Sequence, residues 1–359
     1  MKINKILQHD FDEIIASNKI LDKFKDSTFL ITGATGLIGS LMIKFLMYLN
    51  DKMNFNIRVI GLIRNQDKAN QIFKDYLSEN NLKFLKHNLG SGEIKCDGRV
   101  DYIIHGASIT QSKMMIEKPV EVIKISVDGT KEVLDLAVDK KVKSMVYISS
   151  MEAYGQPDVS GKVTENDLGY LDLTNPRSGY PESKRLCEVL CSSYVSEFGL
   201  SVSSARLAQT FGAGVLPTEN RVFAQFARSV INGEDIVLHT QGNSEGNYIY
   251  TADLISALLT MLIYAEPGQA YNVTNEENHM TIKEMAELVV NNFGNGKSKV
   301  IIDIPKENMG YAPDVKMWLS NQKIRKLMGK VWKPSVNLVE MYRRLIDYLI
   351  NKNVEDYEI

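Results

Sequence analysis

The sequence predicts an α/β fold, in which a doubly wound parallel sheet is joined to a smaller C-terminal α/β lobe. Up to about residue 207, short and continuously apolar segments alternate with helical patterns. Strands that are apolar throughout are typical of parallel sheets covered by helices on both faces. Beyond that point the segments become shorter and more mixed, and 359 residues are too many for one compact core of ordinary size. These observations favour one large domain with a smaller lobe.

The elements of the large domain are predicted in chain order. An amphipathic helix spans residues 3–24, with apolar residues at helical spacing, and it precedes the first core strand as an added element. Strands are predicted at 28–32, 57–63, 82–85, 100–105, 144–149 and 201–207, and helices at 37–49, 120–138 and 182–198.

The rest of the chain is more irregular. Helical patterns return at 281–293 and 336–351, while the stretches near 248–250 and 270–273 are expected to rejoin the main sheet. We therefore predict three parts of the chain, an N-terminal helical extension (1–25), a large domain (26–207 plus about 241–274) and a smaller lobe (208–240 plus about 275–359).

Composition excludes several classes of protein. With 44% hydrophobic and 24% charged residues, the chain has the profile of a soluble globular protein. Its net charge of −2 offers no basic surplus for nucleic acid or an acidic membrane. No apolar run reaches the ~20 residues of a membrane span, and the charged N-terminus does not read as a signal peptide. Three cysteines make no disulfide framework, which favours a reducing cytoplasm, and five histidines without metal-ligand spacing predict no metal site.

A glycine pattern follows the first predicted core strand. Residues 32–39, Thr-Gly-Ala-Thr-Gly-Leu-Ile-Gly, contain G-x-x-G-x-x-G between a strand and a helix. In this context the glycines let the backbone approach a pyrophosphate, and the helix N-terminus offers unpaired N–H groups and a favourable dipole. An ordinary glycine-rich turn is the alternative, and the strand–turn–helix context argues against it. We therefore predict a Rossmann-type dinucleotide site whose first contacts are Gly33, Thr35, Gly36, Leu37, Ile38 and Gly39.

The end of the next strand predicts which dinucleotide is bound. It carries Arg64 and Asn65, where a site for NAD usually has an acidic residue that holds the ribose 2′-hydroxyl. A guanidinium suits a 2′-phosphate by charge and by paired hydrogen bonds. We therefore expect NADP(H) rather than NAD, with a solvated surface arginine as the alternative interpretation of Arg64.

Tyr180-Pro-Glu-Ser-Lys184 forms a Y-x-x-x-K motif at the start of a predicted helix. A spacing of four places Tyr180 and Lys184 on one helical face. We expect the neighbouring ammonium to lower the pKa of the phenol, so that Tyr180 exchanges a proton with an alcohol or carbonyl oxygen during hydride transfer. Ser150, or its neighbour Ser149, ends the preceding strand and is expected to bind the same oxygen. Chance spacing of surface residues is the alternative, and the glycine turn and the serine strand make it improbable.

Together these motifs resemble an extended short-chain dehydrogenase/reductase of the nucleotide-sugar epimerase/dehydratase family. The resemblance covers about residues 26–290 and follows the family's order, with TGATGLIG, HGAS, YISSMEAYG, NPRSGYPESK and ARLAQTFG. NPRSGYPESKR and ENRVFAQF are most similar to the UDP-glucuronate decarboxylase branch. The resemblance implies Ser150, Tyr180 and Lys184 as the catalytic residues, a C-terminal lobe that binds the nucleotide diphosphate of a nucleotide-linked sugar, and a homodimer formed through two helices per subunit.

The resemblance also completes the predicted site. Further cofactor contacts are expected at Asn65, Asn88, Leu89, Ala107 and Ser108, together with Lys184. Substrate contacts are expected at Glu152, Arg177, Gln209, Arg221 and His239.

Four positions depart from the family's pattern. The 4,6-dehydratases carry an Asp-Glu pair where this chain has Met151-Glu152, and methionine cannot be the acid that expels the sugar's 6-hydroxyl. Asn88-Leu89 replaces the usual Asp-Leu near the adenine and keeps hydrogen-bonding groups. Ser126 replaces the asparagine of N-x-x-G-T, and Gly246 replaces an arginine that binds the diphosphate, which leaves that role to Arg221 or Arg228.

Three functions are compatible with these residues. Arg64 favours net reduction by NADPH, and the run RVFAQFARSVINGEDIVLHTQG resembles a capsule-biosynthesis branch that includes an NADP-dependent reductase forming CDP-glucitol. We therefore expect a reductase of a CDP-linked ketose in surface polysaccharide biosynthesis. The alternative is a nucleotide-sugar epimerase or UDP-glucuronate decarboxylase with internally recycled NAD, in which Glu152 could be a base or purely structural. A non-catalytic NADP-binding sensor is disfavoured by the intact Ser150, Tyr180 and Lys184.

Overall fold

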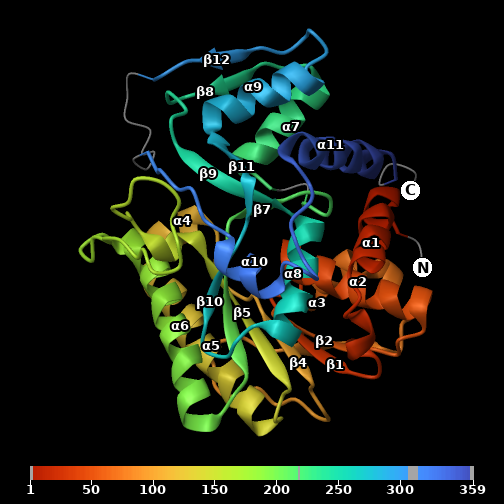
Figure 1. Ribbon diagram of the computed structural model, residues 1–359. Coiled ribbons are helices and arrows are strands. Elements are labelled where there is room, and N and C mark those ends of the chain that lie inside the picture. The colour runs from red at the N-terminus through yellow and green to blue at the C-terminus, as the bar shows by residue number, and fades with distance from the viewer. Residues whose placement is uncertain (1–2, 217–218, 306–313, 356–359) are drawn as a thin grey trace.

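The computed structural model describes residues 3–216, 219–305 and 314–355, with only the backbone for 352–355. Its centre is a seven-stranded, fully parallel sheet with the order β10-β6-β5-β4-β1-β2-β3 (Figure 1). The strands are β1 (Thr28–Thr32), β2 (Arg58–Ile63), β3 (Leu82–Lys86), β4 (Tyr102–His105), β5 (Ser144–Ser150), β6 (Val202–Leu207) and β10 (Ala270–Val273). The predicted α/β fold is confirmed. Because the chain reverses direction across the sheet between β1 and β4, a ligand crevice is expected outside their carboxyl ends.

Two layers of helices cover this sheet. On one face, α5 (Pro119–Asp139) and α6 (Gly179–Phe198) pack over side chains such as Leu30 and Met145. On the other face, α2 (Leu37–Met53) and α8 (Thr251–Tyr264) pack over side chains such as Ile31 and Val146. Adjacent residues of one strand therefore contribute to different cores, as the period-2 geometry of a strand requires. The same layers are visible on either side of the sheet in Figure 1.

The N-terminal extension differs from its prediction. A single helix over 3–24 is wrong, because α1 (Lys5–Ser17) ends at Asn18 and a short 3-10 helix, Leu21–Phe24, follows. The side-chain amide of Asn18 donates to Ser256 Oγ (3.1 Å) and Thr260 Oγ1 (3.3 Å) on α8, and its Oδ1 accepts from Ile20 N (3.3 Å). A polar cap of this kind ends a helix and directs the chain toward the first strand.

A second sheet lies beyond the carboxyl ends of the main one. It has three strands in the order β11-β9-β7, namely β7 (Gln209–Phe211), β9 (Glu245–Tyr250) and β11 (Asn275–Thr281). The expectation that 248–250 rejoins the main sheet is therefore wrong, whereas 270–273 does so as β10. The edge of the main sheet beside β6 is occupied by β10, so β9 pairs with β7, which turns away after Ala208.

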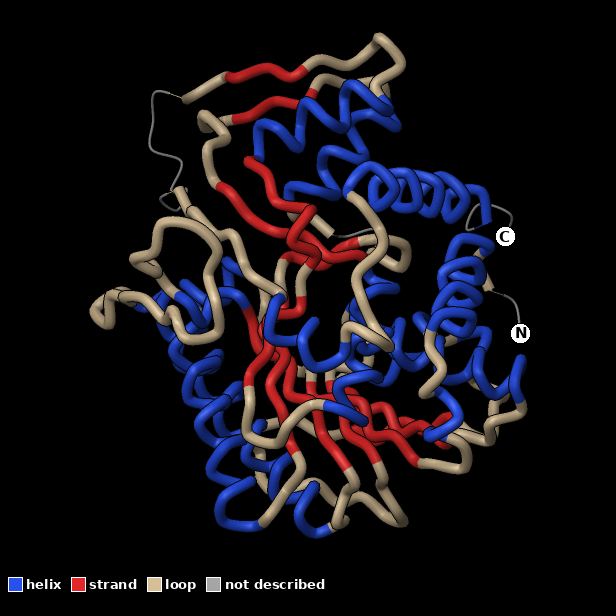
Figure 2. Tube along the Cα trace, viewed as in Figure 1, coloured by secondary structure: helices blue, strands red, loops and turns tan. Residues whose placement is uncertain are grey.

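Most elements of the C-terminal part gather at the top of the view, beyond the second sheet (Figure 2). The helices predicted at 281–293 and 336–351 are observed as α9 (Ile282–Phe293) and α11 (Leu338–Glu355). Beside them lie α7 (Val222–Asn232) and a small sheet of β8 (Ile236–Leu238) and β12 (Val300–Ile302), while α10 (Gln322–Met328) packs near β10. Residues 217–218, 306–313 and 356–359 of the predicted lobe lie outside the described residues.

Shorter helices connect the strands. These are α3 (Gln66–Ile72), α4 (Ser112–Glu117) and the 3-10 segments Lys74–Tyr76, Met151–Tyr154 and Pro176–Ser178. Within the described ranges, none of the helices combines the length and the apolar character needed to cross a membrane.

Candidate active site

The structure brings the three predicted catalytic residues together. Ser150 is the last residue of β5, while Tyr180 and Lys184 lie on successive turns at the start of α6. The Ser150 hydroxyl is close enough to that of Tyr180 to influence its pKa, and the Lys184 ammonium lies 5.6 Å from the centre of the Tyr180 ring. Lys184 Nζ also donates to the backbone oxygen of Ile148, at 2.8 Å. Strand and helix therefore hold a serine hydroxyl, a phenol and an ammonium at one edge of the sheet.

The pKa of Tyr180 does not move in the expected direction. Burial of the phenol raises its pKa above the ordinary value near 10, and the negative charge of Glu152 adds to this rise. The Ser150 hydroxyl and the positive charge of Arg177 oppose the rise in pKa without reversing it. The predicted net lowering is therefore wrong, because desolvation of the phenolate outweighs the cations around it. Burial therefore favours the neutral phenol over the phenolate at this position.

Lys184 and His105 are both governed by burial. Burial lowers the pKa of the Lys184 ammonium to about 8, while the Cys187 thiol and the Glu188 carboxylate act in the opposite direction. Burial, and then the charge of Lys184, lower the pKa of His105 to about 3, so its ring is neutral. The two ring nitrogens of His105 bond to Thr32 Oγ1 (2.7 Å) and Thr130 Oγ1 (3.0 Å). His105 therefore has a structural role, while Lys184 stays protonated at neutral pH.

A carboxylate and a guanidinium accompany the phenol. Glu152 follows Ser150 in a 3-10 turn and forms an ion pair with Arg177, at 2.7 Å between Oε2 and the guanidinium NH2 nitrogen. Arg177 precedes α6 and also lies over the Tyr180 ring, 5.9 Å from its centre. Both side chains are partly exposed, at 38% for Glu152 and 30% for Arg177. The pair can therefore be reached from solvent next to the Tyr180 hydroxyl.

The other predicted substrate residues divide into two groups. Arg221 is the N-cap residue before α7 and is ion-paired with Glu219 (2.7 Å), and its charge is close enough to influence the pKa of Tyr180. Gln209 begins β7 and is half-buried. His239 follows β8, is exposed, and places Nδ1 3.0 Å from the backbone oxygen of Asp303. The strand β8 belongs to the small sheet with β12, so His239 comes from a different sheet than Ser150.

The glycine turn forms a cradle between β1 and α2. A Cβ atom on Gly39 would lie 2.3 Å from the oxygen of Gly33, and one on Gly33, which has φ +67°, would lie 2.9 Å from the backbone of Gly106. No side chain caps the first turn of α2, so its N–H groups are available to a phosphate. On the facing loop, Ser108 Oγ is buried without a partner among the described residues. This open helix end and unpaired hydroxyl fit a dinucleotide.

The cofactor candidates follow the carboxyl ends of four neighbouring strands. Thr35, Leu37 and Ile38 lie after β1, and Ala107 lies after β4, where its backbone N–H donates to Thr32 Oγ1 (3.1 Å). Arg64 follows β2, is exposed, and makes no ion pair within the described part of the chain. Asn65 uses its side chain to cap α3 through Lys68 N (2.9 Å). Asn88, which is exposed, and Leu89, which is buried, follow β3.

Sequence reasoning missed Tyr147. Its ring lies 4.9 Å from Lys184 Nζ, and it is fully buried between β5 and α6. The strand period places Tyr147 on the same face as Ser149, whose hydroxyl donates to Glu188 of α6 (2.6 Å). That alternation was the available signal, because it directs both side chains toward the helix that carries Lys184.

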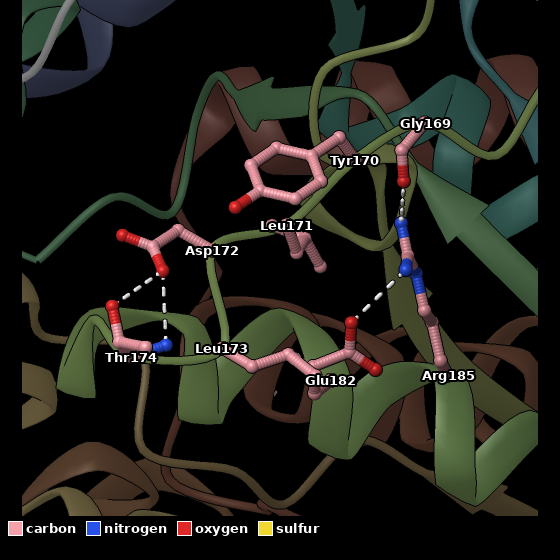
Figure 3. Close-up of a pocket in the computed structure, with 8 residues that line it drawn as sticks. All are labelled: Gly169, Tyr170, Leu171, Asp172, Leu173, Thr174, Glu182 and Arg185. Atoms are coloured by element: carbon pink, nitrogen blue, oxygen red, sulfur yellow. Dashed lines mark hydrogen bonds and ion pairs between the residues drawn. The ribbon is translucent and has the colours of Figure 1, made fainter.

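An open hollow of about 500 Å³ lies on the outer side of α6 and is lined by Gly169–Thr174, Glu182 and Arg185 (Figure 3). Ser150, Tyr180 and Lys184 do not line it. Arg185 points toward the loop and donates to the backbone oxygens of Ala153 (2.7 Å) and Gly169 (2.7 Å). The hollow is therefore separate from the candidate site, while Arg185 fastens the loop that continues from Glu152.

Among the described residues, no group of three or more His, Cys, Asp or Glu side chains could hold a metal ion. The three cysteines, Cys96, Cys187 and Cys191, are free and buried.

Comparison with known proteins gives consistent matches. The model of the NAD dependent epimerase/dehydratase family matches residues 29–274. UDP-glucuronic acid decarboxylase 1 of Xenopus tropicalis is 26% identical over 347 residues, which cover 95% of this chain and 76% of that protein. A crystal structure of UDP-glucose 4-epimerase from Thermotoga maritima, with UDP-glucose, has a TM-score of 0.74 at 20% identity and covers 91% of this chain and 99% of its own. An epimerase of Methanothermobacter thermautotrophicus has a TM-score of 0.77 at 18% identity, with 98% of each chain covered.

Proposed function

Because the chain belongs to the NAD dependent epimerase/dehydratase family, the extended short-chain dehydrogenases/reductases, we propose that it oxidises a nucleotide-linked sugar and returns the hydride to the product, with UDP-glucuronate decarboxylation as its reaction. The observation that carries this proposal is the grouping of Ser150, Tyr180 and Lys184 with the ion pair of Glu152 and Arg177. Similarity to a UDP-glucuronic acid decarboxylase over 95% of the chain supports the same reaction. The proposal therefore favours internal redox cycling over the net reduction expected from Arg64.

Each residue has a defined task in this proposal. Ser150 and Tyr180 bind the sugar's 4-oxygen, and Tyr180 exchanges a proton with it. A dinucleotide held by its pyrophosphate at the glycine turn would supply hydride acceptance and return. Lys184, protonated at neutral pH, stabilises negative charge on the phenol oxygen. Arg177 already holds a carboxylate in the structure, that of Glu152, and it is our candidate for the carboxylate of the sugar. Once C4 is a ketone, the bond between C5 and the carboxylate breaks, carbon dioxide leaves, and the electron pair forms an enolate whose charge on the C4 oxygen is stabilised by Ser150 and Tyr180. A proton from solvent then adds to C5 and restores the ketone, to which hydride returns while Tyr180 gives its proton to the C4 oxygen.

The assay follows the turnover of UDP-glucuronate by the wild-type protein and by a variant of Tyr180. We expect the purified protein to release NAD(H) on denaturation, and to convert UDP-glucuronate to carbon dioxide and a UDP-pentose without net use of added NADPH. The variant Tyr180→Phe removes only the proton donor, and its turnover should fall by about 10²- to 10⁴-fold. Chromatography of the nucleotide products measures the turnover of the wild-type protein and of Tyr180→Phe. Conversion of UDP-glucuronate to an isomer of equal mass would instead indicate an epimerase.

One observation favours a second candidate function, the reduction of a CDP-linked ketose. Arg64 is exposed beside the predicted ribose site, and it forms no ion pair among the described residues. Its guanidinium is therefore available to bind a 2′-phosphate. Consumption of NADPH with CDP-linked fructose, together with no turnover of UDP-glucuronate, would establish this reaction and exclude decarboxylation.

We also propose a homodimer formed through α5 and α6. Large apolar side chains are exposed on the outside of these two helices, including Val120 (77%), Leu186 (47%) and Val189 (60%). Apolar surface of this kind is stabilised when a second copy covers it. We expect sedimentation velocity to give a dimer for the wild-type protein and a monomer for Val189→Asp, with unchanged circular dichroism. A wild-type monomer would contradict the proposal.

A further inference from the structure

The carboxylate of Glu132 binds the loop that follows β3. Glu132 lies on α5, and its side chain is only 11% exposed. Its Oε2 accepts from His87 Nε2 (3.1 Å) and Gly90 N (3.0 Å), and its Oε1 accepts from Gly92 N (2.5 Å). One side chain of a core helix therefore satisfies two backbone donors and one ring donor of a single surface loop, residues 87–92.

The sheet order places this loop at the adenosine end of the proposed dinucleotide. The glycine turn follows β1 and would take the pyrophosphate, while β4 and β5, on one side of β1, lead to Ser108 and Ser150. On the other side of β1 lie β2, which ends before Arg64, and then β3, which ends before His87. A dinucleotide that spans this edge with its nicotinamide near Tyr180 has its adenosine beside loop 87–92.

The loop contains Asn88 and Leu89, the two residues predicted from the sequence to contact the cofactor there. Asn88 is exposed, and its amide has no hydrogen-bond partner in the described ranges. Leu89 packs against α5 where a Cβ atom on Gly129 would lie 2.8 Å from the Leu89 Cβ. The backbone between and after them contains Gly90 and Gly92, so it has many accessible conformations unless another group holds it.

We propose that Glu132 is a positioning residue for the adenosine end of the cofactor: it holds loop 87–92 in the shape that presents Asn88 and Leu89. This inference rests on the proposed function in one respect, that a nicotinamide dinucleotide binds at all. Without the carboxylate, the loop must be ordered when the cofactor binds, and that entropy cost lowers affinity. The reacting groups near Tyr180 lie on the other side of β1 and are unaffected.

The test is a fluorescence titration of NADH and NADPH into the wild-type protein and three variants. We expect Glu132→Ala to raise the Kd of the dinucleotide by roughly 10- to 100-fold, with little change in Tm. Glu132→Gln keeps one oxygen acceptor and should recover most of the affinity. Lys131→Ala is the matched control, because Lys131 is the preceding residue of α5, is exposed, and pairs with Asp135 rather than the loop. At saturating cofactor, kcat of Glu132→Ala should stay within about twofold of wild type.

The outcomes separate the inference from the proposed function. A wild-type protein that binds neither dinucleotide overturns the proposed function and the positioning role with it. Tight binding to the wild type, with equal Kd for Glu132→Ala, overturns the positioning role alone. If Glu132→Ala does not fold, amide hydrogen exchange in folded Glu132→Gln tests the positioning role instead. The amides of Gly90 and Gly92 should then exchange faster than in wild type. Equal exchange rates would overturn the inference.

Discussion

Lys184 is a charged side chain that the fold buries completely. It is 4% exposed, and burial lowers its pKa to about 8 from an ordinary value near 10.5. The backbone oxygen of Ile148 and the ring of Tyr147 compensate part of the lost hydration. At neutral pH the ammonium therefore destabilises the folded state, as is common for groups kept for function rather than for stability.

Replacing Lys184 with methionine should raise stability at neutral pH. We expect Lys184→Met to unfold in urea with about 1 to 2 kcal/mol more stability at pH 7, while losing activity. Below pH 8 both the folded and the unfolded wild-type states hold the Lys184 proton, so the cost of burying the charge is fully present. Between pH 8 and 10.5 only the unfolded state keeps it, so wild type gains stability relative to the variant.

The control for this pH dependence is Lys131→Met, which removes an ammonium that is 61% exposed. Because an exposed charge contributes little to stability, this variant should unfold within about 0.5 kcal/mol of wild type in urea. A Lys184→Met variant that is less stable than wild type at pH 7, or whose advantage persists unchanged at pH 10, would contradict this account of the buried ammonium.

At the residue scale, the sequence was enough to predict which side chains come together, but not the direction of their pKa shifts. Spacing within one helix and the end of one strand were enough to predict that Ser150, Tyr180 and Lys184 meet, because both elements are regular. The direction of the pKa shift of Tyr180 depends on how deeply the phenol is buried and on where Glu152 turns, which the motif does not encode. His239 follows β8, in another sheet from β5, and its contact with the substrate stays a prediction.

At the scale of elements, α1 connects two distant parts of the chain. It lies outside residues 29–274, which match the family, and it packs against both α8 and α11. Arg344 of α11 donates to Asp10 Oδ1 (2.7 Å) and to Glu13 Oε2 (2.6 Å) of α1. The other oxygen of Asp10 accepts from Tyr250 Oη (2.7 Å), at the end of β9. A buried polar network therefore ties the first helix to the last.

Breaking this network at Arg344 should be costly. Arg344→Met leaves Asp10 buried, at 1% exposed, without its guanidinium, so we expect a loss of about 2 to 4 kcal/mol in urea unfolding. Adding Asp10→Asn to that variant removes the uncompensated charge and should recover part of the loss. Arg343→Met is the control, because Arg343 is 56% exposed and its pair with Glu340 is at the surface. Equal stabilities of Arg343→Met and Arg344→Met would contradict the network's role.

Helices and strands were predicted correctly where the apolar periodicity is strong. The prediction failed where a strand could pair with either of two sheets. The strands from β1 to β6 and the helices α5, α6, α9 and α11 follow apolar patterns that local sequence carries. The alternation in Tyr248–Tyr250 identifies a strand but not its sheet, because pairing with β7 and β11 is set by residues far along the chain. The end of α1 at Asn18 depends on hydrogen bonds to α8, which the N-terminal sequence alone cannot reveal.

At the scale of the whole molecule, the strand order determines how the proposed site is divided. The switch between β1 and β4 separates Arg64 and loop 87–92 from Ser108 and Ser150. In a dinucleotide bound across this edge, the adenosine and the nicotinamide would therefore contact different elements. The lobe built on α7, α9 and α11 lies beyond the carboxyl ends of these strands, on the side where the sugar nucleotide is proposed to bind.

The most direct test of the central claim follows the absorbance of the bound nicotinamide after rapid mixing of the purified protein with UDP-glucuronate. We predict that the reduced-nicotinamide band rises and then decays within the reaction, with no net change at its end, and that Tyr180→Phe shows no such rise. An absorbance that stays flat with UDP-glucuronate, while added NADPH is consumed in proportion to a CDP-linked ketose, would contradict internal redox cycling.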